Sequence, residues 1–116
     1  MKSEGFKESE GFPKRIRIKR DKEFEEVVKK GEKKVGFRVV IYRLRENGSS
    51  LKFGIRVGKN IRKAVKRNRI KRILREILRK NKEKFSSQEK ILIIYKSSDE
   101  DVTTEELQKE IFDLLR

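Results

Sequence analysis

The fold class of this chain follows from one stretch, LKFGIRVGKNIRKAVKRNRIKRILREILRK at residues 51–80. Its first seven residues alternate between apolar and polar side chains, which is typical of a β-strand with one buried face. From about Ala64 to Lys80, apolar residues recur instead at helical spacing. This segment is therefore predicted to form a long helix whose apolar stripe faces a core. The stripe consists of Ile70, Ile73, Leu74, Ile77 and Leu78.

Two further elements are predicted before this stretch. Residues 37–44 are rich in β-branched and aromatic side chains, and the turn sequence Asn47–Gly48–Ser49–Ser50 separates them from residues 51–57. We expect the two segments to pair as a β-hairpin. Residues 21–31 carry apolar side chains at positions i, i+3 and i+4, which indicates a short amphipathic helix with Asp21 as its N-cap and Gly31 as its stop.

Two elements are predicted after it. Residues 90–95 contain the apolar run Ile91–Ile94, which is typical of a buried central strand. Thr103 and Glu106 then fit a capping box, with Thr103 as N-cap of a final helix. The predicted fold class is α+β: a single-domain α-β sandwich with a small, mostly antiparallel sheet covered on one face by helices.

Length and composition limit the chemistry open to the chain. Its 116 residues suit one domain, which we place at 14–116 after a flexible N-terminal tail at 1–13. The chain has no Cys and no His, which excludes disulfides, the usual zinc sites and Ser/His or Cys/His catalysis. No apolar run is long enough to span a bilayer and no secretory signal is recognisable, so we expect a cytoplasmic protein without a membrane partner.

Charge gives the first indication of function. The chain carries 34 Lys and Arg against 19 Asp and Glu, a net charge of +15. Residues 59–82 alone hold 12 basic residues and one acid, Glu76. Such crowding opposes folding unless a polyanion neutralises it, so we expect the long helix to bind nucleic acid. RNA is favoured, although a DNA-packaging protein and a merely solvated helix face are the alternatives.

The run from Val57 to Glu76, VGKNIRKAVKRNRIKRILRE, resembles the signature of the bacterial ribonuclease P protein component. The hallmark of that family is an Arg-Asn-Arg core followed by Lys-Arg and a further arginine. The resemblance extends to Arg17–Ile18 and the segment 23–31 upstream, and to the predicted last strand and helix downstream. It covers roughly residues 15–116.

The resemblance implies the protein subunit of a tRNA-processing ribozyme. In that family the RNA subunit holds the Mg²⁺ ions and performs the endonuclease reaction that removes the 5′ leader of precursor tRNA. The expected partners are ribonuclease P RNA and precursor tRNA, with no obligate protein partner. No cofactor or metal intrinsic to the protein is expected, and none of its residues is catalytic. The implied fold contains a left-handed βαβ crossover, an exception to the usual right-handed rule.

The resemblance also assigns residues to two RNA-binding regions. Val28 stands where the family commonly has an aromatic residue. Alanine substitution of the Arg-Asn-Arg core is expected to weaken RNA binding without unfolding the protein, because the core lies off the centre of the apolar stripe. The residues expected to bind the RNA subunit are Lys59, Arg62, Lys63, Lys66, Arg67, Asn68, Arg69, Lys71 and Arg72. The residues expected to line a cleft for the single-stranded leader are Phe24, Tyr42, Arg56, Asn68, Lys71 and Arg75.

Two other functions are compatible with part of the sequence. A ribosome-associated RNA-binding protein without a catalytic role would share the charge and the fold class. A nuclease that uses its own carboxylates would need several acids converging on metal ions. The acids of this chain fall mainly in the tail and near predicted helix ends, which is typical of capping and solvation.

Overall fold

The structure is a computed structural model that describes residues 17–18, 21–48 and 50–116. The predicted tail at 1–13 lies outside the described residues, and so does the side chain of Asp21. The helix expected there begins at Asp21 itself. The elements are α2 (Asp21–Lys30), β1 (Glu32–Val35), β2 (Val39–Arg45), β3 (Lys52–Val57), α3 (Ala64–Lys80), the 3-10 turn η2 (Lys82–Lys84), β4 (Glu89–Tyr95) and α4 (Thr104–Leu115).

The four strands form one sheet in the order β1-β2-β4-β3. β4 pairs antiparallel with β2 and parallel with β3, so the hairpin predicted between residues 37–44 and 51–57 is wrong. The strand that pairs with β2 as its sequence neighbour is β1. The physical reason lies in β4, whose run Ile91–Ile94 is apolar on both faces and is best buried in the middle of the sheet. β2 and β3 therefore lie on either side of β4 and do not pair with each other.

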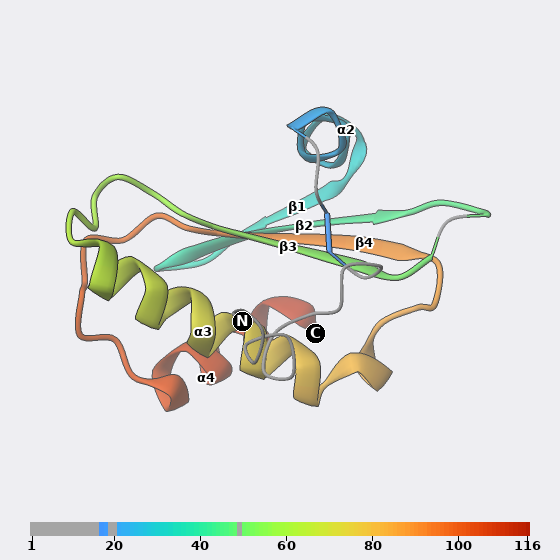
Figure 1. Cartoon of the computed structure of the whole chain (residues 1–116). Coiled ribbons are helices and arrows are strands. Elements are labelled where there is room, and N and C mark those ends of the chain that lie inside the picture. Colours follow the sequence, from blue (N-terminus) through green and yellow to red (C-terminus); the bar gives the residue numbers. More distant parts are fainter. Residues whose placement is uncertain (1–16, 19–20, 49) are drawn as a thin grey trace, which may run out of the picture.

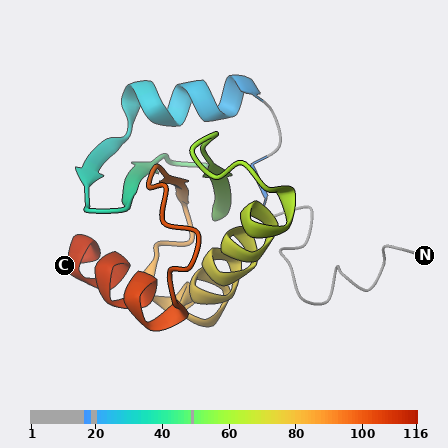
Figure 2. The ribbon, with the colours of Figure 1, turned by 90° about the vertical axis from the view of Figure 1, so that its left-hand side faces the viewer.

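The connection from β3 through α3 to β4 is the expected βαβ crossover. In Figure 2 both strands point toward the viewer, α3 lies below the sheet and β4 lies to the left of β3. This arrangement makes the crossover left-handed, against the general preference for right-handed connections. α3 packs beneath β3 (Figure 2), and its outer side faces solvent.

Helices cover both faces of the sheet, not one face as predicted. Figure 1 shows α2 above the sheet and α3 with α4 below it. The larger core lies on the α3 and α4 side, where the buried residues of the predicted helical stripe pack against Phe53 and Ile93. The smaller core lies under α2 and contains Val27, Val40 and Leu92.

The capping box predicted for the last helix is confirmed. The Glu106 backbone N–H donates to Thr103 Oγ1 at 3.1 Å, and the Thr103 N–H donates to Glu106 Oε1 at 2.9 Å. α4 therefore begins with a side-chain cap and with acids in its first turn, which suits the positive end of a helix dipole. The predicted bounds of α3 are also confirmed.

Candidate nucleic-acid interface

α3 begins in a way that opposes its own stability. Its N-cap is Lys63, which makes no side-chain capping bond, and its first turn contains no acid. Exposed cations precede it at Lys59 and Arg62. Positive side chains are unfavourable at the positive end of a helix dipole. We call residues 58–63 and the solvent-facing side of α3 the α3 surface, and an anion bound there would relieve this repulsion.

Arg67 uses its guanidinium within the protein. Its Nη1 donates to the carbonyl oxygens of Ile61 at 2.8 Å and Arg62 at 2.7 Å. The carbonyl groups just before α3 are thereby satisfied, and the loop is fixed against the helix. Arg67 thus holds in place the loop that carries Lys59 and Arg62.

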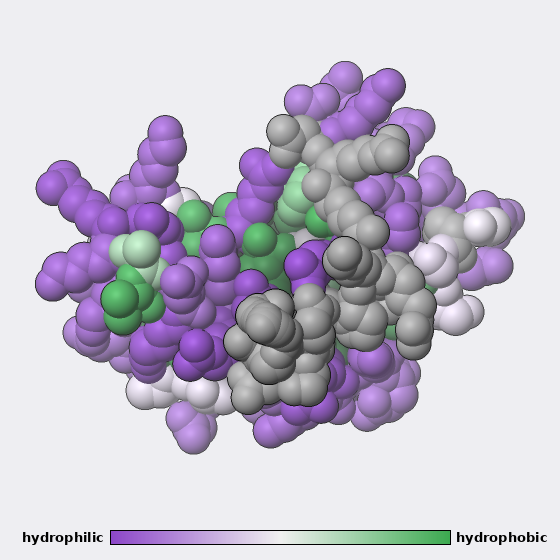
Figure 3. All heavy atoms as spheres, viewed as in Figure 1, coloured by the Kyte–Doolittle hydropathy of each residue, from purple (hydrophilic) through white to green (hydrophobic). Residues whose placement is uncertain are grey.

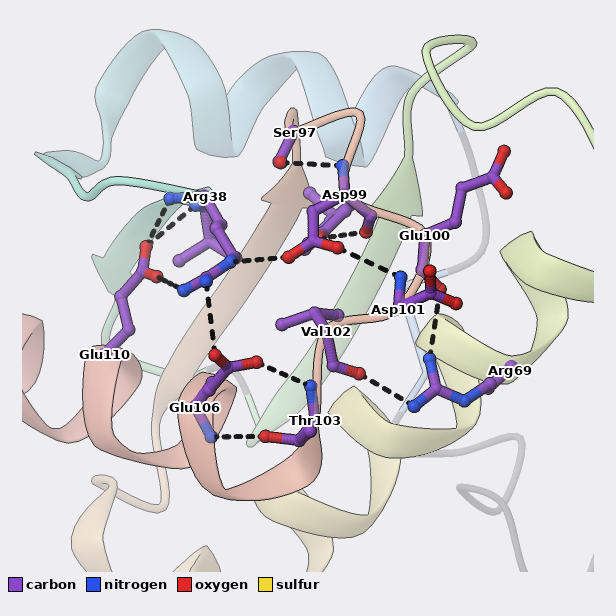
Figure 4. A network of polar contacts seen from close by, with 12 residues as sticks. Arg38, Arg69, Ser97, Asp99, Glu100, Asp101, Val102, Thr103, Glu106 and Glu110 are labelled. Atoms are coloured by element: carbon purple, nitrogen blue, oxygen red, sulfur yellow. Dashed lines mark hydrogen bonds and ion pairs between the residues drawn. The ribbon is translucent and has the colours of Figure 1, made fainter.

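Arg69 is tied to a different segment. Its guanidinium donates to the carbonyl oxygens of Glu100 at 3.2 Å and Val102 at 2.8 Å, which lie in the loop between β4 and α4 (Figure 4). The same loop contains Asp99, which forms an ion pair with Arg38, and Asp101, which forms an ion pair with Lys66. Arg69 therefore joins α3 to a polar network that also holds the start of α4.

The other cations predicted to bind RNA are available to a ligand. These cations are Lys59, Arg62, Lys63, Lys71, Arg72 and Arg75. None of the six side chains forms a hydrogen bond or an ion pair within the part of the chain that the structure describes. The pKa of Arg75 is lowered, first because burial disfavours its charge and then because Arg17 and Arg72 lie near it. Such a concentration of like charge is the electrostatic pattern of a phosphate-binding surface.

A second region lies on the other face of the sheet, beneath α2. It is an open hollow of about 310 Å³ lined by Phe24, Glu25, Val28, Arg56, Leu92 and Ile94. Figure 3 shows apolar atoms on the floor between α2 and the loop that follows β3. An apolar floor beside Arg56 suits an unstacked nucleotide, whose base is apolar on its faces and whose phosphate is anionic.

Phe24 and Arg56 meet at the edge of this hollow. The Arg56 guanidinium carbon lies 4.0 Å from the centroid of the Phe24 ring, a cation–π contact. The ring also packs on β3 at Gly54, where a Cβ would come within 2.9 Å of it. Gly54 therefore allows the edge of the Phe24 ring to pack closely against β3 while the side chain remains only half-buried.

The residues expected to form one leader cleft are divided between the two faces. Tyr42 is on the α2 face, but it is buried, does not line the hollow, and has the Lys33 ammonium 6.0 Å from its ring centroid. Asn68, Lys71 and Arg75 lie on α3, which covers the opposite face. The structure thus brings Phe24 and Arg56 together at the hollow, and none of the three α3 residues is among the side chains that line it.

Ion pairs hold α2 over the sheet. Lys90, on β4, is buried, and its Nζ lies 3.5 Å from Glu23 Oε2, 3.7 Å from Glu26 Oε1 and 3.5 Å from Glu46 Oε1. Lys52, on β3, approaches Glu23 Oε2 at 3.1 Å. These contacts set the position of the helix that forms one wall of the hollow.

The floor of the hollow was not predicted from the sequence. Leu92 and Ile94 were assigned only to a buried strand, because the apolar run of β4 does not show which face is covered. Their alternation with Ile91 and Ile93 becomes informative only once helices are known to cover both faces. Val28 was noted as lacking an aromatic ring, and the structure places it in the hollow with 40% of its surface exposed.

Within residues 17–18, 21–48 and 50–116, no helix is long and apolar enough to cross a membrane. The same part of the chain contains no group of three or more Asp or Glu side chains placed to hold a metal ion.

Known proteins show both the sequence pattern and the fold. The family model Ribonuclease P matches residues 12–116. The ribonuclease P protein component of Bacillus pumilus is 36% identical over 104 residues, which span 89% of this chain and 87% of that protein. The corresponding protein of a Bacillus cereus strain is 34% identical over 89% of this chain and 90% of its own length.

Solved structures agree with these relatives. The RNase P protein of Staphylococcus aureus superposes with a TM-score of 0.77 at 30% identity, covering 86% of this chain and 92% of that one. The RNase P protein of Thermotoga maritima superposes with a TM-score of 0.74 at 24% identity, covering 85% and 94%. The second likeness concerns the fold alone.

Proposed function

This chain belongs to the ribonuclease P protein family, and from that premise we propose that it acts in the cytoplasm as the protein subunit that helps a catalytic RNA remove the 5′ leader of precursor tRNA. The observation that carries the proposal is the α3 surface, on which six cations have no partner within the described part of the chain. Their neutralisation by phosphates would stabilise both the complex and the protein.

The two regions suit two kinds of RNA. The α3 surface is exposed and rich in arginine, whose planar guanidinium binds phosphate through paired hydrogen bonds, so we assign it to the folded RNA subunit. The hollow under α2 offers an aromatic ring, an apolar floor and Arg56, so we assign it to the single-stranded leader. A protein that binds both RNAs holds the substrate beside the catalytic RNA.

We assign the chemical step and its Mg²⁺ ions to the RNA subunit. Several carboxylates near the two regions form structural contacts, whereas Glu25, which lines the hollow, forms none within the described part of the chain. Glu23 and Glu26 form ion pairs with Lys90, Asp101 pairs with Lys66, and Glu106 caps α4. The protein contributes by lowering the repulsion between two polyanions, so the holoenzyme should need less Mg²⁺ than the RNA alone.

Cleavage of precursor tRNA tests the proposal. The ribonuclease P RNA of the same organism is incubated with precursor tRNA at low Mg²⁺, with and without this protein, and the 5′ end of the product is mapped. We expect cleavage at the mature 5′ end only when both components are present. RNA binding without stimulation would favour the ribosome-associated alternative, and cleavage by purified protein alone would overturn the assignment of chemistry to RNA.

A matched pair of variants locates the binding surface. Lys63→Gln removes one charge from the α3 surface, and Lys109→Gln removes one from α4, where acids predominate. Lys63→Gln should weaken binding of the RNA subunit by about threefold to tenfold, the value of one phosphate contact at moderate salt, and Lys109→Gln should leave it nearly unchanged. Equal effects of the two variants would contradict the assignment of the α3 surface.

A further inference from the structure

Val65 is an apolar side chain placed where α3 should carry a polar one. It lies in the first turn of the helix, and 77% of its surface is exposed. Five residues separate it from Ile70, so at 100° per residue the two side chains lie about 140° apart around the helix. Ile70 is fully buried, and Val65 therefore faces away from the core.

Nothing in the folding of α3 accounts for a valine at this position. A β-branched residue in an exposed helix position is less favourable than alanine or lysine, and its methyl groups remain in water. Lysine and arginine occupy most of the surrounding sequence. Figure 3 shows an isolated apolar patch among hydrophilic atoms over the start of α3.

Polar and charged side chains surround Val65 on the helix surface. Asn68 follows at i+3, Arg69 at i+4 and Arg72 at i+7, so Val65, Asn68 and Arg72 form one outward ridge. Asn68 is exposed, and its amide has no hydrogen-bond partner in the described part of the chain. An apolar contact thus lies beside an amide that can both donate and accept, within a field of cations.

We propose that Val65 packs against an unstacked nucleobase of the RNA subunit and that Asn68 bonds to an edge of the same base. This inference rests on the proposed function, because it takes the α3 surface to be the site of RNA binding. Unstacked bases in loops and bulges offer an apolar face and a hydrogen-bonding edge, and an asparagine amide matches such an edge. The surrounding cations would bind phosphate groups, and contacts with phosphate do not distinguish one base from another.

Salt dependence separates a base contact from a phosphate contact. The affinity of the purified protein for the ribonuclease P RNA of the same organism is measured from low to moderate salt. Val65→Ala should lower affinity about tenfold to twentyfold, the loss expected for two buried methyl groups, without changing the slope of log affinity against log salt. Lys63→Gln should instead reduce that slope by about one.

Two further variants control the result. Val35, on β1, is also exposed, at 57%, and lies outside the α3 surface, so Val35→Ala should leave affinity unchanged. Val65→Ile should keep the affinity of the original protein, because it preserves an apolar contact. The thermal midpoint of Val65→Ala should not fall, since alanine is the better helix former.

The outcomes are distinct for the two proposals. If the original protein binds the RNA but Val65→Ala binds equally well, or if its loss is accompanied by a lower thermal midpoint, the base contact is wrong and the RNA-binding function stands. If the original protein does not bind this RNA, the proposed function and the base contact both fail. Loss of affinity with an unchanged slope, together with retention by Val65→Ile, supports the contact.

Discussion

At the scale of single residues, adjacent members of one motif have different tasks. Arg67 and Arg69 bond to main-chain carbonyls, whereas Asn68 between them is exposed on the outer side of α3. The sequence-based expectation that all three could be replaced by alanine without affecting the fold therefore does not apply to the two arginines. Their carbonyl partners would lose charged donors, which is costly where water does not replace them.

We expect Arg67→Ala to lower the free energy of unfolding by about 1–3 kcal/mol, because two carbonyl oxygens lose a charged hydrogen-bond donor. Asn68→Ala should change it by less than about 0.5 kcal/mol. Urea denaturation of both variants measures the difference, and RNA binding is measured in parallel. A stable Arg67→Ala variant would show that water replaces the guanidinium and that the loop needs no such anchor.

Tyr95 provides a pH-dependent test of the core. Its hydroxyl donates to the Asp99 carbonyl oxygen at 2.7 Å, and burial raises the pKa of Tyr95 above its ordinary value near 10. The unfolded chain therefore loses this proton at lower pH than the folded protein. The stabilisation is complete below about pH 10 and is lost as the pH rises above it.

Tyr95→Phe should lower the free energy of unfolding by about 0.5–1.5 kcal/mol at neutral pH, the usual value of one hydrogen bond. The variant should also lose less stability than the original protein between about pH 9 and pH 11, roughly one unit on either side of the ordinary tyrosine pKa. Denaturation curves across this range give both quantities. Identical pH profiles for the two proteins would rule out Tyr95 as the source of the alkaline loss.

At the scale of elements, α2 is attached to the sheet largely through Lys90. The side chain of Lys90 is 9% exposed and faces three glutamates, whose side chains are 22%, 37% and 40% exposed. Lys90→Met would leave these carboxylates facing one another around an apolar side chain. The helix would then be held by Val27, Phe24 and the remaining Lys52–Glu23 ion pair, and the hollow under it would be less well defined.

We expect Lys90→Met to lower the free energy of unfolding by about 1–3 kcal/mol, below the full cost of breaking a buried ion pair because the glutamates are partly solvated. Lys30→Met removes the exposed pair with Glu26 and should cost less than about 0.5 kcal/mol. Chemical denaturation compares the two, and amide exchange in residues 21–30 reports on α2 alone. Unaltered exchange in Lys90→Met would mean that apolar contacts suffice to hold the helix.

The sequence predicts elements better than their arrangement. The periodicity of residues 64–80 and the Thr103–Glu106 capping box gave α3 and α4, because both signals are local. The order of strands was missed because the pairing of β4 with two distant strands leaves no local trace. The candidate site, too, is only partly predictable from the sequence. The basic residues are visible in the sequence, but only the structure shows that Arg67 and Arg69 are engaged by carbonyl groups.

At the scale of the whole molecule, charge is separated by region. Residues 59–82 carry a net +11, and residues 99–113 carry seven acids against Lys109 alone, a net −6. The acidic segment is joined to Arg38 and to the start of α4 in the network of Figure 4. The two regions meet where Lys66 of α3 pairs with Asp101, so a polyanion is attracted along α3 and repelled at the edge next to α4.

The position of β4 has a consequence for the synthesis of the protein. β4 is the last strand in the chain and lies in the middle of the sheet, between β2 and β3. A growing chain therefore completes the basic residues 59–82 before it contains the strand that closes the core. We expect the nascent chain to acquire its affinity for RNA before its fold, and the RNA nearest to it at that moment is the ribosome that is making it.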